Sequence, residues 1–316
     1  MTRSRRDVLR AAGVLAASVA TAGTASASGG WHAVESPTDR SLRDVTHAGG
    51  GAYAVGDDGV ALERRDGGWR PVTTEGPDGN GSNLHALTAD PDGERVWVAG
   101  ASGALAELDV ATNEFASHRA PDDVTNEFSD VAVRGDVVYV AETSGHVHVG
   151  ADGGDGRTWT HETPGSGASI RALSRTANGV ACVDGNGAVF ERADETWTRE
   201  GIEDADHALR AVAHAGSQLR VAGGALYLET AAGWDVTNPS EATLTDLAVS
   251  SCGCVHAVGA DGTVVHRPGR GIPMGTTVAR WLGVWDVTRP VGADLNAVAV
   301  GRPHVAVGAS GTILER

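Results

Sequence analysis

The soft metal ligands of the chain gather in one short segment, where Cys252, Cys254 and His256 occupy every second position. On an extended strand this spacing places the three side chains on one face. Two thiolates and an imidazole suit zinc or copper, so the segment is a weak candidate metal site. The alternatives are a local thiol pair or disulfide, or packing at a hairpin. The remaining cysteine, Cys182, falls among small apolar residues, and we expect it to be buried and inert.

A second set of chemically useful side chains recurs along the chain, each directly after an apolar residue. Three of them are arginines, whose guanidinium groups bind carboxylates through paired hydrogen bonds. Placed together at one mouth of a channel, they would hold a carboxylate or a peptide backbone. The alternative is that they pair with nearby acids. The candidate binding residues are Arg43, His85, Arg171, Arg210 and Asn296, and Ser129 and Thr245 complete the column.

A third candidate is the segment between Gly262 and Trp285, which contains no Asp or Glu in an otherwise acidic chain. Arginine and tryptophan are enriched at the centres of protein interfaces. The segment therefore predicts a partner-binding loop, and the alternative is a long hairpin with its own packing. Its candidate contact residues are Arg267, Arg270, Arg280 and Trp281.

Signatures of catalysis are missing from the sequence. It contains no nucleophile elbow, phosphate-binding loop or zinc-protease motif. A sialidase-like hydrolase would need a tyrosine nucleophile, but Tyr53, Tyr139 and Tyr227 fall in strand positions that predict packing. His146 and His148 share a strand face, which we expect to be solvated. We expect a binding protein without a cofactor rather than an enzyme.

The elements that position these residues form an internal repeat with spacings of 35 to 51 residues. Each copy begins with an apolar residue and continues with a strand that ends in Val-Gly or a similar pair. A tight turn closed by glycine follows, which permits the positive φ of a two-residue hairpin. Another strand and an outer aromatic residue complete the unit. This pattern predicts an all-β, seven-bladed β-propeller of four-stranded blades. The starting residues are Leu42, Leu84, Phe128, Ile170, Leu209, Leu244 and Leu295.

The ends of the chain are expected to close the ring together. The last repeat stops at Arg316 after three strands, while a spare strand begins at Trp31. Pairing the two leaves no open sheet edge. Trp31 then joins the outer aromatic column; the alternative is a frayed tail. The other members of the column are Trp69, Phe115, Trp159, Trp197, Trp234 and Trp285.

The first 27 residues are predicted to lie outside the fold. Arg5 and Arg6 begin a segment that resembles a twin-arginine export signal, and an apolar run and the small residues 25–27 follow. The apolar run is too short to span a bilayer stably, and no later stretch predicts a transmembrane helix. The domains are therefore a signal peptide, 1–27, and one propeller, 28–316. We expect an extracellular or cell-surface monomer.

The charge of the mature chain restricts its partners. Residues 28–316 hold 21 Arg, no Lys and 40 Asp and Glu, a net charge of −19. Such a surface repels the phosphates of nucleic acids and anionic membranes, so we exclude nucleic acid as a partner. An acidic surface without lysine is also typical of proteins from very salty surroundings, and we expect a halophilic source.

A family resemblance rests on three repeated motifs. Leu-x-Asp-Val at 42–45, Val-Gly-x-x-Gly at 55–59 and Asp-Gly-Gly-Trp at 66–69 together resemble the photosystem II stability and assembly factor family. The last motif, with Gly-Arg-Thr-Trp at 156–159, is also similar to the degenerate Asp-box repeats of sialidase-like and WD40- or YVTN-type propellers. The resemblance spans residues 28–316. It implies a propeller that helps to assemble a complex without catalysing a reaction.

Together these features favour an exported propeller that docks a protein or peptide. A carbohydrate-active, sialidase-like hydrolase is the first alternative, and a propeller that binds glycans or small molecules is the second. Tryptophans exposed along one face would favour glycan binding.

Overall fold

The structure is a computed structural model. By its backbone contacts the chain divides into Met1–Gly30 and Trp31–Arg316, and every described strand lies in the second unit. The predicted signal peptide therefore lies outside the described residues. No helix in the described part is long and apolar enough to cross a membrane. The described residues are 30–152, 156–165, 167–202, 205, 207–215, 218–268 and 285–316.

Seven antiparallel sheets of four strands each make up the second unit. From inner to outer strand, the first four blades are β2 (Leu42–Ala48), β3 (Gly51–Gly56), β4 (Ala61–Arg65) and β5 (Gly68–Thr73); β6 (Leu84–Ala89), β7 (Arg95–Gly100), β8 (Leu105–Asp109) and β9 (Phe115–Ser117); β10 (Phe128–Arg134), β11 (Val137–Glu142), β12 (Val147–Asp152) and β13 (Arg157–Glu162); and β14 (Ile170–Arg175), β15 (Gly179–Asp184), β16 (Val189–Ala193) and β17 (Thr196–Arg199).

The remaining three blades follow the same order, except that the outer strand of the last one comes from the N-terminal side. They are β18 (Ala211–Ala215), β19 (Gln218–Ala222), β20 (Leu226–Thr230) and β21 (Gly233–Thr237); β22 (Leu244–Val249), β23 (Val255–Gly259), β24 (Val264–Arg267) and β25 (Asp286–Thr288); and β26 (Leu295–Ala299), β27 (Val305–Gly308), β28 (Ile313–Glu315) and β1 (His32–Ala33).

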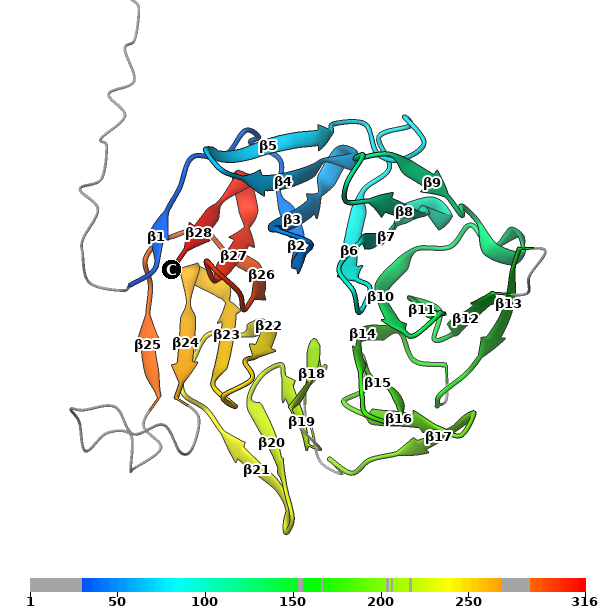
Figure 1. Cartoon of the computed structure of the whole chain (residues 1–316). Coiled ribbons are helices and arrows are strands. Elements are labelled where there is room, and N and C mark those ends of the chain that lie inside the picture. Colours follow the sequence, from blue (N-terminus) through cyan, green and yellow to red (C-terminus); the bar gives the residue numbers. More distant parts are fainter. Residues whose placement is uncertain are drawn as a thin grey trace, which may run out of the picture. The chain divides into compact units, whose positions relative to one another are not determined.

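The inner strands surround the centre of a ring (Figure 1). Six of the seven predicted starting residues are the first residue of an inner strand, and the exception, Leu209, lies two residues before β18. All seven are buried, with at most 2% of each exposed. The predicted seven-bladed propeller is confirmed.

The ring is closed by the two ends of the second unit, whose strands β1 and β28 lie side by side (Figure 1). His32 pairs with Glu315, and the backbone N–H of Val34 donates to the carbonyl of Ile313 at 3.0 Å. Trp31 packs against the buried apolar cluster shared by the sixth and seventh blades. The predicted closure is confirmed, and the alternative of a frayed tail is wrong.

The turn after the second strand differs from the predicted two-residue hairpin. In the first blade it is the three-residue 3₁₀ turn η1 (Asp57–Gly59), in which Asp58 and Gly59 have φ of 57° and 76°. Gly56 before it is extended, but a Cβ there would lie 2.2 Å from the carbonyl oxygen of Ser41. The first glycine is therefore required by a close approach, and the second by its positive φ. The turn recurs as η2 (Ala101–Gly103), η4 (Ala260–Gly262) and η6 (Ala309–Gly311).

Apolar clusters between neighbouring blades form the core. One of them joins Tyr53 and Val55 of the first blade to Leu84 and Val98 of the second. Cys182 is likewise fully buried in the cluster of the third and fourth blades, as predicted. Neighbouring blades therefore bury their faces against each other.

Carboxylates near the rim of the ring fasten one blade to the next. Glu315 of the seventh blade accepts hydrogen bonds from Arg64 Nε and Nη2 at 2.7 and 3.0 Å, and from Trp69 Nε1 at 2.9 Å, both in the first blade. The pair is bidentate and largely shielded, the stronger form of this interaction. The same arrangement joins the third and fourth blades through Glu162, Arg192 and Trp197.

The prediction that His148 lies on a solvated face is wrong. Its side chain is buried between blades, and Nε2 lies 2.7 Å from Oε2 of Glu142. Burial favours the neutral form of Glu142, but hydrogen bonds from Ser144, Asn126 and His148 outweigh it and lower the pKa of this carboxyl. His148 therefore completes a buried polar network.

Candidate functional site

In six of the seven blades, the polar residue that follows the starting residue lies at a β-bulge. In the first blade Leu42 pairs with Gly56 and Asp44 pairs with Val55, so that Arg43 is passed over. The same shift occurs in five other blades, and Arg210 directly precedes β18. A bulge re-aims the side chain of the residue it releases. All seven residues lie at the start of an inner strand, at one end of the ring, and are here called the mouth ring: Arg43, His85, Ser129, Arg171, Arg210, Thr245 and Asn296.

Four members of the mouth ring bind the next blade through its backbone. His85 Nδ1 lies 3.1 Å from the carbonyl oxygen of Phe128, and Asn296 Nδ2 donates to the carbonyl of Leu42 at 2.7 Å. Ser129 and Thr245 donate to the carbonyls of Ile170 and Leu295 at 2.8 and 2.7 Å. Since their polar atoms are engaged between blades, His85 and Asn296 hold the ring together and are poorly placed to bind a ligand.

Three aspartates form a second tier of contacts between inner strands. Asp44, Asp130 and Asp246 each accept a backbone N–H from the next blade, at 2.8, 2.6 and 2.8 Å. Burial raises the pKa of Asp44 to about 6. Burial, and then the charge of Asp44, raises the pKa of Asp246 to about 7 and that of Asp130 well above its ordinary value. The three carboxyl groups therefore share the electrostatic environment of the channel.

The fourth and fifth blades depart from this scheme. Their mouth-ring residues are Arg171 and Arg210, and the next residue is alanine, as it also is in the second and seventh blades. Both arginines are exposed, and in the described part of the chain neither has a hydrogen-bond or ion-pair partner. The Arg171 guanidinium lies beside Gly185, where a Cβ would be in ordinary contact with Nε at 3.5 Å. Two neighbouring blades thus present guanidinium groups that bind no other described residue.

Arg43, in the first blade, is exposed but not free. Its guanidinium binds Asp57 through two hydrogen bonds, from Nε at 2.8 Å and from Nη2 at 3.0 Å. A ligand carboxylate would have to displace Asp57 to bind it in the same way. Arg43 is therefore a peripheral member of the site, and Arg171 and Arg210 are its centre.

The opposite face holds the other candidates. Arg267 ends β24, where its guanidinium lies 5.3 Å from the centre of the Trp285 ring. It lines a cavity of about 700 Å³ between the fifth and sixth blades, together with Arg220 and Cys252. The other predicted contact residues of this loop, Arg270, Arg280 and Trp281, lie outside the described residues.

The weak candidate metal site is not assembled in the structure. Cys252 and Cys254 are bonded to each other, so neither sulfur is a thiolate. His256 is buried beside His266 and His304, with ring centres 4.6 and 4.9 Å away. Burial and then the neighbouring imidazoles lower the pKa of His256 to about 3. The described residues include no group of three His, Cys, Asp or Glu side chains placed to hold a metal.

The features that would favour the alternative functions are not met by the described residues. Tyr53, Tyr139 and Tyr227 are buried within the blades, as the sequence predicts, so no tyrosine is placed as a nucleophile. The seven described tryptophans pack in or against the apolar clusters between blades, whereas glycan binding would favour tryptophans exposed along one face. The channel aspartates are committed to backbone N–H groups.

Solved structures of known proteins share this fold at low sequence identity. A structure of YCF48 bound to a D1 peptide superposes with a TM-score of 0.70 and 16% identity, over 90% of this chain and 96% of that chain. YCF48 from Cyanidioschyzon merolae gives 0.67 and 19%, over 90% and 98%. The WD40 β-propeller domain of Doa1 gives 0.70 and 13%, over 91% and 96%. The resemblance inferred from the sequence is confirmed as a likeness of fold. No protein-family profile and no curated protein matches the chain.

Proposed function

We propose that the protein is a docking propeller that binds a protein or peptide by a carboxylate at the mouth ring. The observation that carries the proposal is the pair of exposed guanidinium groups of Arg171 and Arg210 on adjacent blades, neither of which has a partner among the described residues. An arginine offers a planar fork of donors that matches a carboxylate. The ligand is then a chain terminus or an Asp or Glu side chain.

The surroundings of the two arginines support a local contact rather than long-range attraction. The mature chain carries a net charge of −19, which repels an acidic ligand at a distance. At about 1 M salt the Debye length falls to about 3 Å, so this repulsion is screened while close contacts persist. The site therefore suits a salty medium, in keeping with the halophilic source that we propose.

Fold-level likeness adds modest support. One similar structure holds a D1 peptide on a YCF48 propeller. Propellers host many functions, so this likeness shows only that the architecture can present a peptide site. The proposal for this chain rests on its own arginines.

Changing both arginines should weaken peptide binding by about tenfold or more, because each guanidinium contributes charge-assisted hydrogen bonds. The measurement is a titration of the full chain, in about 1 M salt, with a library of short peptides that end in a free carboxylate. Arg171→Ala/Arg210→Ala is compared with Arg175→Ala/Arg199→Ala, which removes two exposed arginines away from the mouth ring. Equal affinities for the two double variants would refute the site.

We also propose that the chain is exported through the twin-arginine route. Cleavage after Ala27 would leave the whole described propeller intact, since β1 begins at His32. A route that carries folded proteins suits a ring whose two ends must meet before it is stable. Arg5→Lys/Arg6→Lys should leave the protein inside the cell, as measured by fractionation, and unchanged export would contradict this route.

A further inference from the structure

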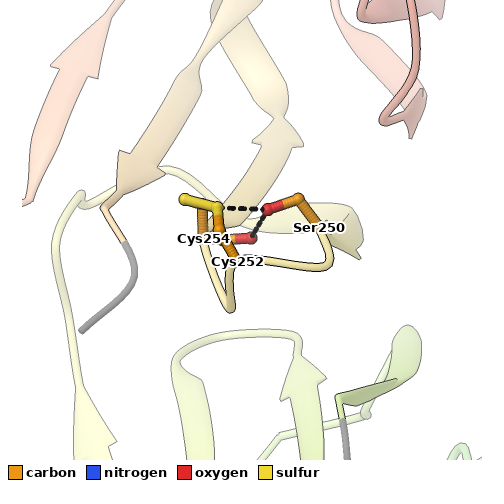
Figure 2. Close-up of a disulfide and its surroundings, with 3 residues drawn as sticks. All are labelled: Ser250, Cys252 and Cys254. Carbon is orange, nitrogen blue, oxygen red and sulfur yellow. Dashed lines mark hydrogen bonds between the residues drawn. A yellow bond between two sulfur atoms is a disulfide. The ribbon is translucent and has the colours of Figure 1, made fainter. Parts of the chain in front are cut away.

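The hairpin turn between β22 and β23 carries a disulfide between Cys252 and Cys254, with one residue between them (Figure 2). It lies at the end of an inner strand, on the face opposite the mouth ring. Both cysteines are partly exposed. The only other cysteine, Cys182, is fully buried in the core.

The turn does not need the bridge to hold its shape. Ser250 N–H donates to the carbonyl of Cys254 at 3.0 Å, and Gly253 N–H donates to the carbonyl of Ser250 at 2.8 Å. The corresponding turn of the first blade closes through Gly49 and Gly50 with no sulfur. A cross-link stabilises a fold mainly through the length of chain it closes, and this one encloses a single intervening residue. The disulfide is therefore poorly explained as a structural brace.

The disulfide lies at the wall of a cavity. Cys252 lines the space of about 700 Å³ between the fifth and sixth blades. Arg220 and Arg267 line it as well, and the pKa of Arg220 is lowered by burial and then by the charge of Arg267. Glu229 and Asp235 also line the cavity, so its wall carries two guanidinium groups and two carboxylates. A thiol entering this cavity would meet Cys252.

A hydroxyl group is aimed at the same sulfur. Ser250 Oγ lies 2.9 Å from Cys252 Sγ and 3.4 Å from the carbonyl oxygen of Cys254 (Figure 2). A disulfide sulfur has no proton, so the hydroxyl is the donor. In the reduced protein the same hydroxyl would stabilise a thiolate on Cys252. The two cysteines are therefore unequal, because Cys252 lines the cavity and Cys254 does not.

We propose that Cys252 and Cys254 form a thiol–disulfide exchange site, which takes the thiol of a peptide or small molecule seated in the cavity between the fifth and sixth blades. The incoming thiolate attacks Cys252 Sγ, the bond between the two sulfurs breaks, and Cys254 leaves as a thiolate that takes up a proton. A second thiolate then attacks the mixed disulfide at its non-protein sulfur, which releases an oxidised ligand disulfide and leaves two protein thiols. Two ligand thiols are oxidised for each protein disulfide reduced.

Single-cysteine variants test the asymmetry. Purified Cys254→Ser and Cys252→Ser chains, each folded and fully reduced, are mixed with oxidised glutathione, and the adduct is followed by intact mass after acid quenching. We expect Cys254→Ser, which keeps Cys252, to form the mixed disulfide about tenfold faster than Cys252→Ser. Cys182 should stay unmodified in both, because burial raises the pKa of its thiol. Equal rates would overturn the assignment of Cys252 as the reacting sulfur.

A second measurement separates an exchange site from an inert brace. The oxidised full chain is treated with reduced glutathione at about millimolar concentration, and free thiols are counted by alkylation. We expect the bridge to open in the folded protein, and Ser250→Ala to slow the Cys252 adduct of the first experiment by about threefold or more. Ser251→Ala, which changes an exposed neighbour on the same turn, is the control. A bridge that opens only after unfolding in urea would overturn the proposal.

Discussion

Deleting residues 28–36 should lower the free energy of unfolding of the propeller by more than about 5 kcal/mol. This loss is larger than the one expected from any single core substitution. The deletion removes β1, so that β28 becomes an open edge and the contact of Trp31 with the apolar cluster is lost. It also exposes Glu315. This residue pairs with His32 in the β1–β28 sheet and accepts a hydrogen bond from Arg64 of the first blade. For a chain of this size we expect the melting temperature to fall by at least about 10 °C.

The matched control is the chain without residues 1–27, the predicted signal peptide. It keeps β1 and should melt like the full chain in a calorimetric or circular dichroism scan. If the deletion of residues 28–36 melted at the same temperature as this control, closure of the ring by β1 would be unimportant for stability. The comparison isolates the closing strand from any effect of a shortened terminus.

The second large effect concerns pH. The pKa of Asp246 is raised by burial, then by Asp44, from 3.8 to about 7 in the folded protein. Between these values the folded state holds a proton that the unfolded state has released. The contribution to stability is therefore complete below about pH 4 and is lost as the pH rises through about 7. From about pH 5 to pH 8 this carboxyl alone should lower the free energy of unfolding by about 2 kcal/mol.

The measurement is urea unfolding of the wild type and Asp246→Asn at about pH 5 and pH 8, in one salt concentration. Asparagine does not titrate, so the wild type should lose about 2 kcal/mol more than the variant over this range. The histidines contribute to both proteins and largely cancel in the difference, which also includes the charge coupling of Asp246 to Asp130 and Asp44. Equal losses in the two proteins would show that Asp246 titrates in the folded state as it does in the unfolded state.

The fold was predictable because the same residue pattern occurs several times along the chain, and each copy predicts the same blade. The starting residues, the outer aromatic column and the closing strand each follow from apolar periodicity, and packing between blades makes that periodicity necessary. The turn was harder. The glycine of the Val-Gly pair is required by a neighbouring carbonyl from another strand, a tertiary contact that no local pattern records.

The positions of the candidate site residues were predictable from the sequence, but the role of each residue was not. The sequence places the mouth-ring residues in one column, yet it cannot show that His85 and Asn296 reach the backbone of the next blade, because that depends on the bulge. The channel aspartates were visible as the repeated Leu-x-Asp-Val motif and were interpreted only as a structural signature. Their absence does not mark the two arginines, because alanine follows His85 and Asn296 as well as Arg171 and Arg210.

The remaining differences have similar causes. His148 was assigned to a solvated face because the pattern of alternate residues does not show that both faces of a third strand are covered by neighbouring blades. For Cys252 and Cys254 the spacing allowed a metal site, a thiol pair or a disulfide, and only the geometry of the turn distinguishes them.

The most direct test of the proposed function is a crystal structure of the full chain with the tightest-binding peptide from the carboxylate library, grown in high salt. We predict that a peptide carboxylate lies against the guanidinium groups of Arg171 and Arg210, at the mouth of the channel formed by the starts of the inner strands. A peptide bound on the opposite face, or one whose carboxylates contact neither arginine, would contradict the account.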